Sequence, residues 1–525
     1  MTRSIRGLRA ALGLLSTAAL VACGGGGSAE TDGIRTALGD KGIKEGFSIP
    51  RVAGCRGPND SPEEALQGQV PKAVRESPEG FKGYNCNLEL VGQLQGEGGN
   101  WSSAMFTDSA GRNCAYYATA APTAARQNPG VPVIDITDPS RPVRTTSLTT
   151  PGMIGPWESL RANPRRQMLM ADQGTGPASP FFDIYDLSGD CRSPQLLASL
   201  KVGDGSDGGI VLPRAVVGHE GSISPDGLTY YIGELGGSGS YHAIDITNAT
   251  KPKLIATFNV RTAFGVAPHG LSVSEDGNRM YGVTFGQGRA GQADTVPANN
   301  GFVIYDTSEV QQRKPNAQIK VISSTFFRDG SAGQHTIPIK IDGRQHLVMV
   351  DEGGSGSMDA ACAAGMAPFP MARIYDITDE KNPVLVKKLA LETHDPANCD
   401  QIRPDPVSAF FSYGSHYCSV DNRENATALA CGYFNSGIRV FDIRKPEKTK
   451  EIAYYNPASV PVLPAGSSHG GSWRKGGPDW CTSRIDWDFQ KRQIVTMCQD
   501  NGLLVLGFGP GTWPFPQSTP SREHN

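Results

Sequence analysis

The chain has 525 residues, of which 64 are Gly and 38 are Pro, about a fifth of the total, against an average near 12%. Only 19% of the residues are charged and the net charge is −3. This balance leaves no basic surplus for binding a phosphate backbone, so nucleic acid is excluded as a partner. No G-X-Y period runs through the chain, which excludes collagen. Many turn residues and few charges favour a fold of many short strands.

The first 22 residues are a predicted export signal. Arg3, Arg6 and Arg9 precede an apolar run that is too short to span a bilayer. The run ends in Leu20-Val21-Ala22-Cys23, which resembles the lipobox of bacterial lipoproteins and implies cleavage before Cys23 and lipidation of that residue. An ordinary secretory signal is the alternative. We expect residues 23–83 to be a tether and linker, and the protein to be membrane-anchored in the bacterial cell envelope, facing the periplasm or the cell surface.

Ten of the eleven cysteines remain once Cys23 is set aside. An even number in an exported chain predicts disulfides, and the lack of a CxxC pair disfavours a thiolate metal site. Two pairs are typical of hairpin partners: Cys418 with Cys431, and Cys481 with Cys498. A third pairing, Cys362 with Cys399, is a further hypothesis.

One short pattern recurs seven times along the body of the chain, at intervals of roughly 60 residues. It consists of apolar residues, an Asp, another apolar residue and a polar turn, and Gly507 replaces the Asp in the last copy. We expect the Asp to end a strand, where its carboxylate can accept hydrogen bonds from the N–H groups of the turn. The six Asp residues are Asp135, Asp186, Asp245, Asp306, Asp376 and Asp442.

Each copy lies in a frame of four predicted strands. Hairpin turns such as Asp226-Gly227, Asp276-Gly277 and Asp342-Gly343 precede it, with positive φ expected at both turn residues. Seven such units without helical periodicity predict an all-β fold, a seven-bladed β-propeller, over residues 84–510. The seventh unit lacks a fourth strand, which residues 87–94 are predicted to supply, closing the ring. Residues 511–525 are expected to be a C-terminal tail.

The repeat resembles the LVIVD-repeat family. The nearest copy begins with Ile374-Tyr375-Asp376-Ile377-Thr378-Asp379 and continues to Pro383 and Val384. The resemblance covers residues 87–510 and implies a propeller on an exported or surface protein. Since the motif is mostly structural, binding specificity is expected in the loops.

Four of the nine histidines open the first strand of consecutive units: His219, His269, His335 and His416. First strands line the channel of a propeller, so these imidazoles are predicted to converge and could bind Fe, Cu or Zn. Four-histidine iron in a seven-bladed propeller resembles the carotenoid oxygenases, and a metal-bearing propeller also resembles the selenium-binding, methanethiol oxidase family. The alternative is that the recurrence is inherited with the repeat, each ring bonding a turn carbonyl.

The remaining units carry aromatic residues at the corresponding position: Trp101, Trp157 followed by Glu158, and Trp480. Together with His469, on a loop before the last unit, they are predicted to form a pocket wall or to plug the channel. Two functions stay open. The first is a monomeric binding or scaffold module whose protein or small-molecule ligand is unknown. The second is a metal-dependent enzyme, possibly an oxidoreductase, that uses the four histidines.

Overall fold

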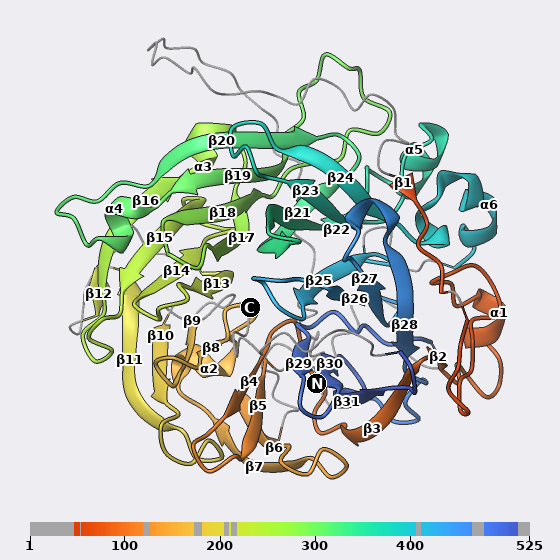
Figure 1. The fold of residues 1–525 in the computed structure, drawn as a ribbon, viewed down its shortest axis with the longest axis horizontal. Coiled ribbons are helices and arrows are strands. Elements are labelled where there is room, and N and C mark those ends of the chain that lie inside the picture. Colours follow the sequence, from red (N-terminus) through yellow and green to blue (C-terminus); the bar gives the residue numbers. More distant parts are fainter. Residues whose placement is uncertain are drawn as a thin grey trace, which may run out of the picture.

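The computed structural model describes residues 47–52, 54–118, 127–172, 181–203, 209–211, 218–405, 411–464 and 477–512. Within these ranges, seven sheets stand around a central axis (Figure 1), which confirms the predicted seven-bladed β-propeller. In each blade the first strand lies nearest the axis and the fourth lies at the rim. The helices are short: α1 (Lys72–Arg75), α2 (Pro151–Ile154), α3 (Val260–Phe264), α4 (Ser308–Gln311), α5 (Met358–Ala363) and α6 (Cys399–Ile402).

The first four blades follow the chain without interruption, each an antiparallel meander. Blade one contains β4 (Ser103–Thr107), β5 (Asn113–Tyr117), β6 (Val131–Asp135) and β7 (Val143–Leu148). Blade two contains β8 (Arg161–Asn163), β9 (Met168–Asp172), β10 (Phe181–Asp186) and β11 (Gln195–Gly203), with β12 (Ile210–Val211) added in parallel. Blade three contains β13 (Glu220–Ile223), β14 (Thr229–Gly233), β15 (Ser240–Asp245) and β16 (Lys253–Asn259). Blade four contains β17 (Pro268–Val273), β18 (Arg279–Thr284), β19 (Asn300–Asp306) and β20 (Lys320–Phe327).

The last three blades include strands from the N-terminal region. Blade five contains β21 (Ser331–Ile341), β22 (Arg344–Gly353), β23 (Ala372–Asp376) and β24 (Val384–Leu389), with β1 (Phe47–Ser48) added in parallel. Blade six contains β25 (Ser415–Val420), β26 (Ala428–Tyr433), β27 (Ile438–Asp442) and β28 (Lys450–Asn456), with β2 (Tyr84–Cys86) added antiparallel. Blade seven contains β29 (Asp486–Asp488), β30 (Gln493–Cys498), β31 (Gly502–Phe508) and β3 (Leu88–Leu94).

The repeated Asp ends the third strand of six blades, as predicted. Its Oδ1 accepts a hydrogen bond from the backbone N–H two residues later, at distances from 2.8 Å at Asp186 to 3.1 Å at Asp442. The equivalent bond is present at Asp135, Asp245, Asp306 and Asp376. The carboxylate therefore replaces a strand partner at the point where the chain turns towards the rim.

The hairpin turns differ in part from the expected geometry. Asp342 and Gly343 both have positive φ, 49° and 75°. In the other two turns only the glycine is left-handed, with φ of 71° at Gly227 and 74° at Gly277. The expectation for both residues was wrong there, because the Asp instead caps the turn: Asp226 Oδ1 accepts the Leu228 N–H at 2.9 Å.

The N-terminal strand closes the ring as predicted. β3 pairs antiparallel with β31 from Leu88 opposite Phe508 to Leu94 opposite Leu503. Leu88 is fully buried between blades six and seven. The pairing joins the two ends of the propeller and covers an edge that would otherwise be open.

Residues 47–83, expected as a linker, pack against the outside of blades five and six, where Figure 1 shows β1 and α1. Glu63 forms an ion pair with the fully buried Arg439, and Phe81 is 1% exposed. Cys55 is bonded to Cys86. The described part of this segment is thus an outer layer of the propeller. Cys23 and the tether up to residue 46 lie outside the described residues, as does the tail from residue 513.

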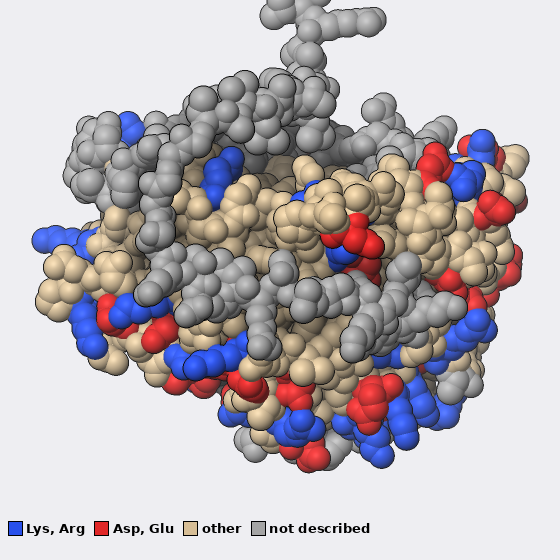
Figure 2. All heavy atoms as spheres, turned by 90° about the horizontal axis from the view of Figure 1, so that it is seen from above, with Lys and Arg blue, Asp and Glu red and all other residues tan. Residues whose placement is uncertain are grey.

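All three predicted cysteine pairs are disulfides: Cys418–Cys431, Cys481–Cys498 and Cys362–Cys399. Two further bridges, Cys55–Cys86 and Cys114–Cys191, complete the ten cysteines. Viewed along its edge (Figure 2), the molecule carries charged side chains of both signs, interspersed over the lower part of this view. None of the described helices is long and apolar enough to cross a membrane.

Candidate metal centre

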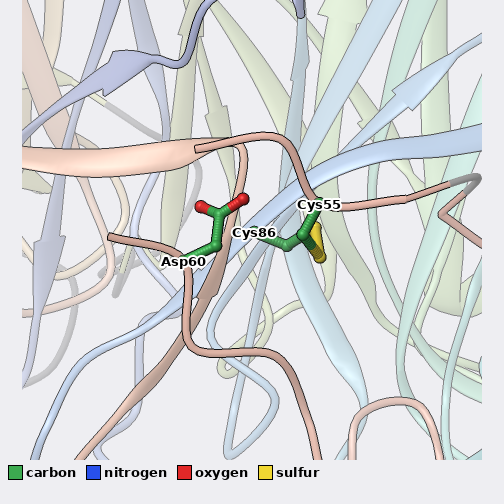
Figure 3. A group of neighbouring side chains, drawn as sticks. All are labelled: Cys55, Asp60 and Cys86. Carbon is green, nitrogen blue, oxygen red and sulfur yellow. A yellow bond between two sulfur atoms is a disulfide. The ribbon is translucent and has the colours of Figure 1, made fainter. Parts of the chain in front are cut away.

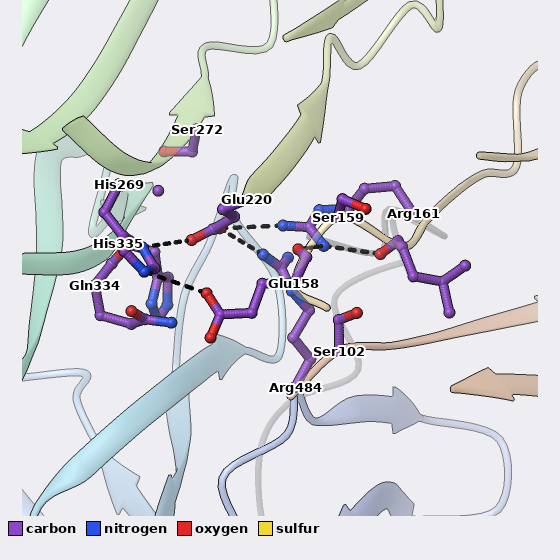
Figure 4. Close-up of polar contacts among 12 residues, drawn as sticks. Ser102, Glu158, Ser159, Arg161, Glu220, His269, Ser272, Gln334, His335 and Arg484 are labelled. Carbon is purple, nitrogen blue, oxygen red and sulfur yellow. Dashed lines mark hydrogen bonds and ion pairs between the residues drawn. The ribbon is translucent and has the colours of Figure 1, made fainter. Parts of the chain in front are cut away.

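Three histidines surround the carboxylate of Glu158 at the mouth of the channel where the inner strands begin. Glu158 Oε2 lies 3.5 Å from His219 Nε2 and 3.4 Å from His269 Nε2. The other oxygen, Oε1, lies 3.4 Å from His416 Nε2. We call these four residues the Glu158 cluster; Figure 4 shows Glu158 and His269 within it.

The start of each inner strand positions the histidines. His269 and His416 are the second residues of β17 and β25, and His219 directly precedes β13. Glu158 enters from the segment before β8, where Trp157 has a left-handed backbone with φ of 51°. Such a conformation costs about 1–3 kcal/mol for a bulky residue and is found where a site requires it. The strained turn delivers Glu158 to the channel axis.

Backbone carbonyls orient two of the imidazoles. His269 Nδ1 donates to the Gln334 carbonyl at 3.0 Å, and His416 Nδ1 donates to the Thr482 carbonyl at 2.9 Å. A carbonyl can only accept, so these bonds place a proton on Nδ1. In the neutral ring the lone pair then lies on Nε2, which faces Glu158. This arrangement is typical of metal-ligating histidines, whose other nitrogen is fixed by a carbonyl or carboxylate.

Two further buried carboxylates flank the cluster. Glu352 Oε2 lies 3.2 Å from His416 Nε2, and Glu220 Oε2 lies 3.3 Å from His269 Nδ1. On its far side Glu220 binds two guanidiniums, those of Arg161 at 3.1 Å and Arg484 at 2.8 Å (Figure 4). The cluster is therefore one end of a continuous chain of charges along the channel.

The neighbouring carboxylates control the charge of the imidazoles. Burial alone would lower the pKa of His269, but Glu158 and Glu220 raise it to about 9. Burial opposes Glu158 and Glu352 in the same way at His416, whose pKa rises to about 9. Burial and the nearby His269 instead lower the pKa of His219 to about 3. Burial would raise the pKa of Glu158, but the three imidazoles hold it well below its usual range.

The cluster brings together donor atoms of the kinds that transition-metal sites use. One ligand atom from each of Glu158, His219 and His269 lies within 4.8 Å of the other two. Within the described part of the chain, Glu158 Oε2, His269 Nε2 and His416 Nε2 are buried and make no hydrogen bond. Buried polar atoms without partners are costly, and an ion bound by Glu158 Oε2 and His269 Nε2 would satisfy two of them. Two imidazoles and one carboxylate are a ligand set for iron(II) or zinc.

The structure brings three of the four predicted ligands to Glu158, and His335 is not among them. The inner strands of all three blades shift register at this point, and His335 is the first paired residue after the shift, as Leu271 and Cys418 are in β17 and β25. His335 therefore occupies a place two residues beyond that of His269 and His416 and lies further along the channel. Its Nε2 lies 3.2 Å from the carbonyl oxygen and 3.4 Å from the backbone nitrogen of Cys418.

Aromatic rings line one side of the cluster, at three of the predicted pocket positions. The Trp101 ring lies 4.5 Å from the His416 ring and stacks on Trp157 at 5.7 Å, measured between centroids. Trp480 packs against the edge of Trp101 at 6.3 Å. These residues form a wall beside the histidines. His469, the other predicted pocket residue, lies outside the described residues.

Two other groups of candidate ligands are not metal sites. Cys55, Asp60 and Cys86 lie together, but the two sulfur atoms form a disulfide (Figure 3). Asp60 there accepts the backbone N–H of Asn87 at 2.9 Å. In the group of Asp108, Asp190 and Cys191, the cysteine is likewise bonded to Cys114. A disulfide sulfur offers no thiolate to an ion.

Sequence reasoning identified Glu158 as a pocket residue but missed its central role, and it missed Glu220 and Glu352. Glu220 directly follows His219 in the sequence, which is a local signal that could have been used. Glu352 ends a second strand and reaches His416 across a blade boundary. No pattern within one repeat indicates such a contact.

No protein-family model and no curated protein matches the chain. Among solved structures, a candidate 6-phosphogluconolactonase from Bacteroides uniformis is similar with a TM-score of 0.46 and 12% identity, over 74% of this chain and 90% of that one. The periplasmic gluconolactonase PpgL from Pseudomonas aeruginosa is similar with a TM-score of 0.45 and 13% identity, over 76% and 93%. Identities this low carry no information about substrate.

Proposed function

We propose that the protein is a metal-dependent enzyme of the oxidoreductase class, with its ion held by Glu158, His219 and His269. The observation that carries this proposal is the carboxylate of Glu158 facing three imidazoles, with Glu158 Oε2 and His269 Nε2 buried and making no hydrogen bond within the described chain. Two imidazoles and one carboxylate on one side of an ion leave other positions open, and a redox-active ion can activate oxygen there.

The other residues of the channel mouth support and orient these ligands. Gln334 fixes the His269 ring, and Glu352 lies beside His416, which in turn faces the second oxygen of Glu158. Such outer partners set ligand orientation and affinity. His219, with 14% of its side chain exposed, is the least buried member of the cluster. Its ring lies 6.1 Å from Trp157, so this side suits a substrate with an apolar or aromatic group.

We further propose that the protein is exported and anchored to the cell envelope through Cys23. The signal sequence and the lipobox resemblance motivate this location, and the five disulfides support an oxidising compartment. The resemblance to the LVIVD-repeat family is consistent with the same location.

A binding or scaffold module is the second candidate, and the electrostatics of the cluster favour it in one respect. With the pKa values of His269 and His416 raised to about 9, protonated imidazoles can neutralise the buried carboxylates without an ion. The cluster would then be a structural ion-pair network. The two candidates differ in metal content.

Elemental analysis of protein purified without a His tag separates them. We expect stoichiometric Fe, Cu or Zn, lost in Glu158→Gln and in His269→Ala but kept in His335→Asn, because His335 lies outside the cluster. His346→Gln, a buried histidine on β22, is a matched control for the loss of an imidazole. Metal-free protein that also fails to take up these ions, or metal that is retained in both test variants, would contradict the proposal.

Oxygen consumption by the metal-loaded protein tests the reaction class. Uptake that is supported by apolar or aromatic reductants and lost in Glu158→Gln is expected. A loaded protein that consumes no oxygen with such compounds would leave metal binding intact but refute the oxidoreductase assignment.

A further inference from the structure

A fully buried glutamine of blade five, Gln334, lies beside the Glu158 cluster with both polar atoms of its side chain unpaired. None of its surface is exposed. Among the residues that the structure describes, neither its Nε2 nor its Oε1 has a hydrogen-bond partner. A buried amide that makes no hydrogen bond is costly to the fold. The packing around Gln334 thus leaves its amide without the partner that a buried polar group requires.

The backbone holds Gln334 in this place from both sides. Ala332, two residues before it, has a left-handed backbone with φ of 51°, which is strained for a residue with a side chain and is typical of functional sites. The N–H of Gly333 donates to Asn300 Oδ1 at 2.9 Å. The carbonyl of Gln334 itself accepts from His269 Nδ1 at 3.0 Å. The amide is therefore presented by a fixed and strained segment.

Gln334 holds in blade five the place that a histidine holds in the neighbouring blades. It is the residue without a strand partner in the bulge of β21, and His269 and His416 lie in the corresponding bulges of blades four and six. Figure 4 shows its amide on the side of the His269 ring where the carboxylate of Glu158 lies. The repeated position thus brings an uncharged amide to the same mouth of the channel as the imidazoles.

The chemistry of the amide selects an uncharged partner. A glutamine offers donors on Nε2 and an acceptor on Oε1, so its partner must both accept and donate. A carboxylate only accepts and an ammonium only donates, and either would leave one atom of the amide unpaired. An anion would in addition be repelled by Glu158 and Glu352, which face His416 from two sides. A hydroxyl or a carboxamide group can pair with both atoms.

The rings beside the cluster indicate the remainder of the ligand. Trp101 stacks on Trp157 at 5.7 Å and lies 4.5 Å from the ring of His416, measured between centroids. Such a wall favours an apolar or aromatic body, while a few polar groups fix its orientation.

We propose that Gln334 binds the polar end of the molecule that reaches the Glu158 cluster, and that this end is a hydroxyl or carboxamide group on an aromatic or apolar body. Gln334 is then a specificity-determining residue, because an analogue that lacks the donor leaves a buried atom of the amide unpaired. The inference rests on the proposed function for the reaction that follows, but the binding step itself needs no ion.

Isothermal titration with benzamide, benzyl alcohol and acetophenone tests the proposal. The three aromatic compounds are similar in size, but acetophenone can only accept a hydrogen bond. The full chain is titrated in EDTA, so the outcome does not depend on metal binding. We expect benzamide, benzyl alcohol or both to bind at one site per chain, about tenfold more tightly than acetophenone, which leaves Oε1 unpaired. The tighter of the two identifies the group, and equal affinities for all three compounds, or no binding, would overturn the proposal.

Gln334→Met removes the amide and keeps the length of the side chain. The preference over acetophenone should disappear in this variant, and any metal that the unsubstituted protein takes up should be kept. Gln67→Met is the matched control, because Gln67 is also buried but lies in the outer layer, where its Nε2 donates to the Pro50 carbonyl at 2.8 Å. It should keep the preference. A preference that persists in Gln334→Met would overturn the proposal, and so would loss of bound metal, which would make Gln334 a ligand.

Urea denaturation separates ligand binding from a structural role. Gln334→Met should keep or raise the urea midpoint, because it removes two buried polar atoms that have no partner. Gln67→Met should lower the midpoint, since it breaks the bonds to Pro50 and to Glu451 Oε2. Gln334→Leu is a second variant in case the methionine is not accommodated. A lower midpoint in both Gln334 variants, or failure of both to fold, would show that the amide supports the fold and would overturn the proposal.

Discussion

The protonation of the Glu158 cluster predicts how the stability of the metal-free protein depends on pH. His269 and His416 have pKa values raised from 6.5 to about 9 in the folded chain. A histidine whose pKa is higher in the folded than in the unfolded chain stabilises the fold. This stabilisation is complete below pH 6.5, the pKa in the unfolded chain, and is lost as the pH rises through 9, the pKa in the folded chain. Each shift corresponds to about 3 kcal/mol. Because both rings share Glu158, we expect a combined loss of about 4 kcal/mol between pH 6.5 and 9.5.

Other buried groups act in a different pH window. Burial raises the pKa of Asp172 and of Glu451 to about 7, so their destabilising ionisation is nearly complete by pH 8. The lowered pKa of His219, about 3, has the opposite sign to that of the other histidines and weakens the fold only as the pH falls below 6.5. Unfolded tyrosines are still almost fully protonated below pH 9, so the interval from pH 8 to 9 reports on His269 and His416.

Urea denaturation of EDTA-treated protein at half-unit pH steps measures this loss. The double variant His269→Gln/His416→Gln should lack the decline above pH 8. A flat free energy of unfolding between pH 7 and 9.5 in the unsubstituted protein would refute the assigned protonation states.

Metal binding gives the same prediction a second readout. Ligating imidazoles must be neutral, so an ion that binds the cluster at pH 7.5 should release at least one proton, that of His269. Calorimetry in two buffers of different ionisation enthalpy measures this proton. The loaded protein should also show a smaller decline in stability above pH 8, because binding favours the neutral ring of His269. Metal uptake without proton release would contradict the raised pKa of His269.

Three predictions concern the stability of the ring. Leu88→Ala should lower the free energy of unfolding by about 2–5 kcal/mol. Leu90→Ala, at a position on the same strand that is 42% exposed, should change it little. Equal effects of the two variants in urea denaturation would argue against closure of the ring by β3. Arg439→Ala should cost about 3–5 kcal/mol, because two carboxylates lose their buried partner, and a melting temperature like that of the unsubstituted protein would argue against this role. The double variant Cys481→Ala/Cys498→Ala should cost about 3 kcal/mol for a 17-residue separation, and unchanged stability would show that this bridge is dispensable.

The fold could be predicted because its determinants are local and repeated. Each Asp such as Asp135 acts within two residues of itself, so a short pattern is enough to find the end of a strand. Ring closure followed from counting strands, since the seventh unit ended one strand short. The outer layer at 47–83 could not be predicted in this way. Its contacts, such as that of Glu63 with Arg439, join residues far apart in the sequence.

The position of the histidines was predictable to within two residues. His335 was placed with His269 and His416 because all three precede a similar apolar stretch. All three inner strands are bulged at this point, but the bulge leaves two residues unpaired in β17 and β25 and only one in β21. His335 therefore begins the paired part of its strand, whereas His269 and His416 lie within the bulge. The sequence contains no marker of the shorter bulge, so alignment of the repeats alone could not exclude His335.

The repeated strand pattern places the histidines of the site, and residues that depart from the repeat add its charged carboxylate and guanidinium groups. His219, His269 and His416 occupy one repeated position, and three neutral imidazoles alone could be explained as a shared structural feature. Glu158 breaks the pattern, because blade two places a carboxylate beside that position on a strained turn. In the same blade, Arg161 adds a cation that connects through Glu220 to His269 of blade four. Since no other described blade repeats this pair of an acid and a base, the channel is asymmetric, and the proposed enzyme would use that asymmetry to orient a substrate.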